Sequence, residues 1–109
     1  AGGAAGFPSG GLPFITVTLY SGLGSYSTGV NAHVSAHEIG HCIGLRHTDW
    51  FSRQSCGSNQ SEGTAGVGAV LIPGTPSGYD ATSYMRACFS GSETGAFNSN
   101  DITALNYLY

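Results

Sequence analysis

The residue types best suited to catalysis lie in one short segment, from His37 to His47. His37 and His41 are four residues apart, so on a helix they lie about 40° apart around the axis and roughly 6 Å from each other. Both imidazoles can then reach one tetrahedral ion. Gly44 lets the chain leave the helix through positive φ, after which His47 can return as a third ligand. This spacing predicts a Zn²⁺ site of three histidines with a fourth position open to water.

Glu38 follows the first of these histidines and is rotated about 100° from it on a helix. Its carboxylate is therefore expected beside the open coordination position. Zinc held by three neutral ligands keeps its full charge, which lowers the pKa of bound water toward about 7 and polarises a carbonyl. With Glu38 as general base, and later as the acid that protonates the leaving amine, the predicted reaction is amide hydrolysis by a metal-activated water.

Two plainer explanations of the segment compete with this one. A helix could carry histidines that are only packed or solvated, but three His, one Glu and one Gly at these positions arise by chance on the order of once in 10⁵ sequences. A zinc ion could also be retained for structure alone, although structural zinc usually has four protein ligands and more cysteine. We therefore favour a catalytic site.

Other polar residues near this segment fit a metal site less well. His33 lies one turn before His37, but Val34 then occupies the position that a base would need, so His33 is expected to be a wall or packing residue. Cys42 points about 120° away from the zinc direction and is expected in a disulfide or in the core. Asp49 is expected mainly to cap a turn.

Regular structure around the segment is expected to be sparse, because 18 of the 109 residues are glycine. The zinc helix should begin near Ser27 or Thr28 and end at Gly44. Its histidines share a side with Val30 and Val34 and its other apolar residues lie opposite, so we expect a central helix covered on both sides. The other elements expected are strands over 14–20 and 67–72, a polar loop over 49–66, and a final helix capped by Asn98 or Ser99 with Asp101 in its first turn.

The segment from His37 to His47 resembles the extended zinc signature of the metzincin metallopeptidases, and the residues from Ser83 to Arg86 resemble their Met-turn. The resemblance implies that Met85 forms a hydrophobic floor beneath the histidines. The chain is most similar to the bacterial dual-action HEIGH metallopeptidases, over about Gly6 to Tyr109. The similarity lies in the motif His-Glu-Ile-Gly-His, in Thr48 and Asp49, and in the later residues 72–76.

The chain also departs from metzincin patterns. Astacins and serralysins have a tyrosine two residues after the methionine, where this chain has Ala87, and adamalysins have aspartate directly after the third histidine, where this chain has Thr48. A metzincin domain has about five strands and a backing helix, whereas this sequence has room for two strands, 2–7 at the cleft edge and 14–20 beside it. We therefore expect residues 1–109 to form a single α+β domain equivalent to the C-terminal part of a metzincin domain. Either the N-terminal strands and backing helix belong to a missing segment of the same precursor, or the chain is a minimal variant.

Composition restricts the partners. Charged residues make up 8% of the chain, with three basic residues against six acidic ones, so nothing could neutralise a row of phosphates and nucleic acid is excluded as a partner. No apolar run approaches the roughly 20 residues that span a bilayer, which excludes membrane insertion. Abundant glycine and small polar residues, with no lysine, suit an exported extracellular or periplasmic protein. Cys42, Cys56 and Cys88 allow three alternative disulfides.

The favoured function is a zinc endopeptidase that binds an extended peptide or protein substrate along its edge strand, where main-chain hydrogen bonds can form. The alternative is a fragment that binds zinc or a partner without turnover.

Overall fold

The computed structural model describes residues 2–63 and 69–109, and these form two compact units. The first unit comprises Ala1–Arg46 and Phe89–Ala96, and the second comprises His47–Cys88 and Phe97–Tyr109. The described regular structure is a two-stranded sheet, two α-helices and two short 3-10 turns, which confirms a small α+β fold. None of the helices in the described ranges is long and apolar enough to cross a bilayer.

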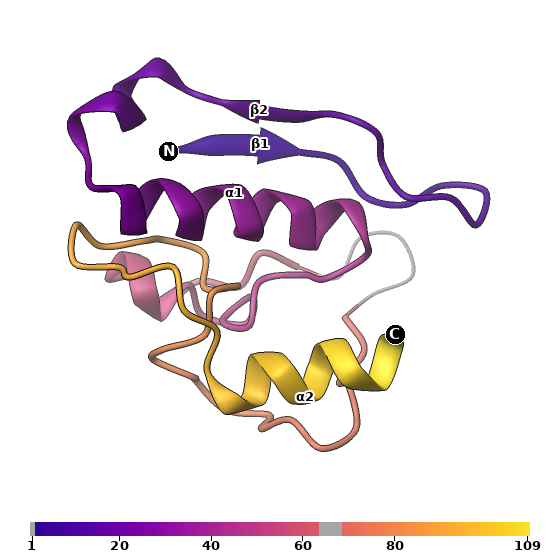
Figure 1. The fold of residues 1–109 in the computed structure, drawn as a ribbon. Coiled ribbons are helices and arrows are strands. Elements are labelled where there is room, and N and C mark those ends of the chain that lie inside the picture. Colours follow the sequence, from indigo (N-terminus) through magenta and orange to yellow (C-terminus); the bar gives the residue numbers. More distant parts are fainter. Residues whose placement is uncertain (1, 64–68) are drawn as a thin grey trace. The chain divides into compact units, whose positions relative to one another are not determined.

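A short antiparallel sheet lies along the long helix of the first unit (Figure 1). β1 (Gly3–Ala5) pairs with β2 (Val17–Leu19) in a register that sets Ala4 opposite Thr18. Both strands are shorter than the sequence predicted over 2–7 and 14–20, because the ladder covers three positions on each strand, and beyond it the Tyr20 amide still donates to the Gly2 carbonyl at 3.0 Å. A 3-10 turn (Ser21–Ser25) then leads from the sheet toward the helix.

Helix α1 (Thr28–Cys42) begins and ends as its sequence predicts. The Ser27 hydroxyl accepts a hydrogen bond from the Val30 amide and so caps the first turn. At the other end Gly44 has φ +111°, a conformation that favours glycine. The Leu45 amide then donates to the Gly40 carbonyl and the Gly44 amide to that of His41, which is the Schellman arrangement.

The apolar core of the first unit is small. Leu23, Val30 and Val34 are buried together, and Phe89 packs against them. The expectation that α1 is covered on both sides is wrong in part, because Ile39 on its other side remains 53% exposed. The helix therefore buries its histidine-bearing side and leaves part of its aliphatic side in solvent.

Irregular chain dominates the second unit, which also contains a 3-10 turn (Gln54–Cys56) and α2 (Ser99–Leu108). Asn98 caps α2 by accepting from the Asp101 amide, and the Asp101 carboxylate accepts in turn from the Asn98 amide, completing a capping box. The sequence predicts a strand over 67–72. Residues 69–72 adopt no strand, and residues 67–68 lie outside the described residues.

Cross-links within the second unit compensate for its lack of regular structure. Cys56 and Cys88 form a disulfide across a sequence separation of 32 residues, whereas Cys42 of the first unit is a free, buried thiol.

Asp80 accepts hydrogen bonds from Asn98, Asn100 and Thr82. Burial alone would raise the pKa of Asp80, but these hydrogen bonds outweigh it and hold that pKa below its ordinary value of 3.8.

Candidate metal centre

His37 and His41 occupy successive turns of α1, and both side chains are buried. Their Nε2 atoms lie 3.1 Å apart, with the rings nearly perpendicular at 88°. His41 Nδ1 lies 2.7 Å from the Leu45 carbonyl oxygen. Because a carbonyl only accepts, this contact places the His41 proton on Nδ1 and leaves Nε2 as the nitrogen able to bind a metal. The Gly44 turn, which aims the Leu45 carbonyl at this ring, thus sets the orientation of a histidine as well as the end of the helix.

The side chain of Glu38 is also buried, 6% exposed, with Oε1 4.0 Å from His37 Nε2. Strand β1 lies directly on it. A Cβ added at Gly3 would come within 3.0 Å of Glu38 Cγ and 2.8 Å of the Thr18 carbonyl oxygen. The strand can therefore approach this carboxylate only because residue 3 has no side chain.

His47 is the first residue of the second unit. Its Nδ1 lies 2.8 Å and 3.0 Å from the two carboxylate oxygens of Glu62. The Glu62 carboxylate therefore holds the orientation of the His47 ring, as the Leu45 carbonyl holds that of the His41 ring. His37, His41 and His47 are a group that could hold a metal ion, each offering one ring nitrogen. Three neutral imidazoles fit the zinc or other transition-metal sites that keep an open coordination position.

Met85 lies in a turn of the second unit formed by residues 83–86, and is 2% exposed. The Arg86 amide closes this turn on the Ser83 carbonyl, and the Met85 carbonyl accepts from the Thr48 amide at 3.0 Å. Tyr84 is also buried. Burial, together with the charges of Asp101 and Tyr109, raises the pKa of Tyr84 to about 12, so its phenol is neutral at any ordinary pH.

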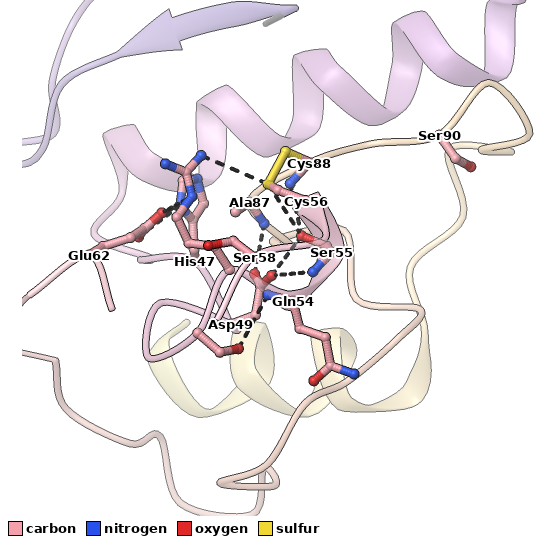
Figure 2. Close-up of a disulfide and its surroundings, with 12 residues drawn as sticks. His47, Asp49, Gln54, Ser55, Cys56, Ser58, Glu62, Ala87, Cys88 and Ser90 are labelled. Carbon is pink, nitrogen blue, oxygen red and sulfur yellow. Dashed lines mark hydrogen bonds and ion pairs between the residues drawn. A yellow bond between two sulfur atoms is a disulfide. The ribbon is translucent and has the colours of Figure 1, made fainter. Parts of the chain in front are cut away.

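Asp49 proves to be more than a turn-capping residue. Its carboxylate is completely buried and accepts from the Ala87 amide at 2.8 Å, the Ser55 amide at 2.9 Å and the Ser55 hydroxyl at 2.6 Å. Burial by itself would raise the pKa of Asp49, but the bonds from Ser55 and Ala87 prevail and lower it. Asp49 thus ties the segment after His47 to the segment after Met85 within the second unit (Figure 2).

The residues set aside from metal binding lie as follows. His33 is buried, with Nδ1 3.8 Å from a carboxylate oxygen of Glu93, and it is not among the three histidines of the candidate group. The Cys42 thiol is buried and points toward the Thr16 carbonyl at 3.8 Å, as expected for a core thiol. Glu62 could not be identified from the sequence, because nothing in a polar loop indicates that a carboxylate fifteen residues after a histidine will return to it.

Histidines on successive turns of a helix, with a glutamate between them, are characteristic of the metal centres of zinc peptidases. A family model described as "Dual-action HEIGH metallo-peptidase" matches residues 1–109, the whole chain, and the chain therefore belongs to this family of metallopeptidases. The resemblance noted in the sequence is confirmed, and it extends beyond Gly6 to the first residue. No curated protein and no solved structure matches the chain.

Proposed function

We propose that this metallopeptidase is a zinc-dependent endopeptidase in which His37, His41 and His47 bind the metal and Glu38 is the general base. The observation that carries the proposal is the pair of Nε2 atoms 3.1 Å apart on α1, each on a buried ring, with a buried glutamate between them in the sequence. His41 supports it further, because its Nδ1 is committed to the Leu45 carbonyl.

Zinc, when bound, supplies a Lewis acid that polarises the scissile carbonyl. Side chains of the protein carry out the remaining steps. Glu38 Oε1 takes a proton from the attacking water and afterwards delivers it to the leaving amine. Because Glu38 is almost fully buried beneath β1, few solvent molecules compete for that proton, and its carboxylate stays close to one position. Met85 and Gly44 take structural roles, as a buried apolar floor and as the turn that aims the Leu45 carbonyl.

An extended peptide or protein is the proposed substrate. β1 pairs with β2 along one edge, and an extended chain can add to the other edge of a strand through main-chain hydrogen bonds. We place this activity in one catalytic domain over residues 1–109, with a further segment of the same precursor as a candidate partner. Neither nucleic acid nor a bilayer is proposed as a partner.

The test compares the wild-type chain with Glu38→Gln, which keeps the size of the side chain but not its basicity. We expect one equivalent of zinc in both proteins, and cleavage of an unfolded protein at internal bonds by the wild type, with a rate about 10²–10⁴-fold lower in the variant. Glu93→Gln, which alters a carboxylate beside a histidine outside the ligand group, is the matched control and should cleave normally. Equal cleavage by Glu38→Gln, or release of terminal residues only, would contradict the proposal. Zinc without any turnover would instead favour a binding fragment.

We also propose export to an extracellular or periplasmic compartment. The disulfide between Cys56 and Cys88 supports this, because such bonds persist in oxidising compartments and are rare in a reducing cytosol. Alkylation of thiols before lysis, followed by mass spectrometry of the fractionated cells, should find Cys56 and Cys88 unmodified in the exported fraction. Full alkylation of both residues would contradict export.

A further inference from the structure

Glu62 makes the closest contact of any carboxylate with a histidine among the described ion pairs. Both of its oxygens lie within 3.0 Å of His47 Nδ1, whereas Glu93 Oε1 lies 3.8 Å from His33 Nδ1. Figure 2 shows the Glu62 side chain turned toward His47 within the second unit. The contact is made to Nδ1, which leaves the other ring nitrogen, Nε2, available to a metal.

The chain around Glu62 holds the carboxylate in this place. The Glu62 amide donates to the Trp50 carbonyl at 2.8 Å, which fixes the backbone beside the segment that follows His47. Arg53 Nε lies 3.3 Å from a carboxylate oxygen of Glu62. Arg53 is held in turn by a 2.6 Å bond from its amide to the Asp49 carbonyl, and it adopts a left-handed backbone with φ 55°. The Glu62 carboxylate is therefore anchored through its own backbone and through a neighbouring cation.

We propose that Glu62 is a positioning residue for the metal centre: its carboxylate keeps the His47 proton on Nδ1 and presents Nε2 to the metal. This inference rests on the proposed function, because it requires His47 to be a ligand. An anionic acceptor also makes the opposite nitrogen a stronger donor to the metal than a neutral acceptor does. Of the two proposed ligands whose Nδ1 contacts are described, His41 contacts a carbonyl and His47 a carboxylate, so His47 gains the larger increase in ligand strength.

The alternative is that the pair is an ordinary ion pair at the surface. Both side chains are only partly covered, 21% exposed for His47 and 25% for Glu62, and such pairs contribute little to folding. The two explanations differ in what they predict. A surface pair should change neither metal affinity nor the ligand field, whereas a positioning residue should change both while leaving the metal-free fold as stable as before.

The experiment measures the zinc dissociation constant of the full chain by competition with a chromophoric chelator. Glu62→Ala should weaken zinc binding by about 10–100-fold, the usual effect of removing the carboxylate behind a metal-bound histidine. Glu62→Gln should lose less, since its amide oxygen can still accept from Nδ1. The matched control Glu93→Ala removes the carboxylate beside His33 and should bind zinc as the wild type does. In the background of His47→Ala, Glu62→Ala should have no further effect.

Two other readouts separate positioning from a merely structural role. The visible spectrum of the cobalt-loaded chain should change in Glu62→Ala and recover toward the wild type in Glu62→Gln, whereas the melting temperature of the metal-free chain should stay the same. Unchanged zinc affinity in Glu62→Ala, or an equal effect with and without His47, would overturn the inference while leaving the proposed function intact. A wild-type chain that binds no zinc would overturn the proposed function itself.

Discussion

Asp49 offers the sharpest test of how the second unit is held together. Its buried carboxylate accepts three hydrogen bonds, and replacement by alanine leaves the amides of Ala87 and Ser55 and the Ser55 hydroxyl without that acceptor. Bonds to a charged acceptor are worth about 1.5–3 kcal/mol each, but the donors can regain some water and the carboxylate no longer has to be desolvated. We therefore expect Asp49→Ala to lower the free energy of unfolding by about 3–5 kcal/mol. Asp49→Asn, which keeps one acceptor oxygen, should lose about 2 kcal/mol.

The assay for this prediction is urea unfolding of the oxidised chain in the presence of chelator, so that bound metal does not contribute to stability. Fluorescence of Trp50, the single tryptophan, reports on the second unit directly beside Asp49. Asp80→Ala is the control: it also removes a carboxylate that accepts several hydrogen bonds, but Asp80 is itself only partly buried and its donors Asn98 and Asn100 use side-chain amides that can turn to water, so its loss should be about 1 kcal/mol. Losses below about 1 kcal/mol in both Asp49 variants would refute the reasoning, because the donors would then have found other partners.

The other predictions concern the disulfide and two titrating groups. Removing the 32-residue cross-link with Cys56→Ser and Cys88→Ser together should lower the free energy of unfolding by about 3–4 kcal/mol on a chain-entropy estimate. Reductant should then no longer change the urea midpoint, and a midpoint equal to that of the oxidised wild type would contradict this estimate. Since the pKa of Asp80 is lower in the folded chain than its ordinary 3.8, its stabilisation is complete above that value and is lost as pH falls through the folded pKa. Stability measured on the metal-free chain should therefore fall more steeply in acid for the wild type than for Asp80→Asn, and parallel curves would argue against it. The pKa of Tyr84 is raised from 10.0 to about 12, so an absorbance titration should show a late phenol that disappears in Tyr84→Phe, and the stability due to the neutral phenol should be complete below pH 10 and fall as pH rises from there through the folded pKa.

The sequence predicted those parts of the fold that depend on local signals. Ser27 and Gly44 mark the two ends of α1, and Asn98 with Asp101 marks the start of α2, because caps act on the backbone within one turn. The residues of the candidate group were identified for the same reason: two of the three lie on one helix, and the third follows a single turn. Strand lengths were overestimated, because alternation of side chains does not reveal where a partner strand stops.

Contacts across irregular chain could not be predicted in this way. The pairing of Cys56 with Cys88 depends on how two loops meet, and the sequence left three alternatives equally open. The same is true of Glu62, whose position relative to His47 is fixed by a hydrogen bond to the Trp50 carbonyl. The importance of Asp49 was underestimated because its partners, Ser55 and Ala87, include one far along the chain. Long-range contacts of this kind have no periodicity for a sequence pattern to reveal.

Asp101 makes two distant parts of the second unit depend on each other. One carboxylate accepts from the Ser83 hydroxyl at 2.6 Å and the Tyr84 amide at 3.1 Å, and it also closes the first turn of α2 through the Asn98 amide. Neither part can open without breaking bonds that the other relies on, so they form one cooperative unit of local unfolding. Amide protons at Tyr84 and in the first turn of α2 should then exchange with solvent at a common rate. A substitution at position 101 must also satisfy both geometries at once, which leaves aspartate with few replacements: asparagine lacks the second acceptor oxygen, and glutamate is one methylene too long.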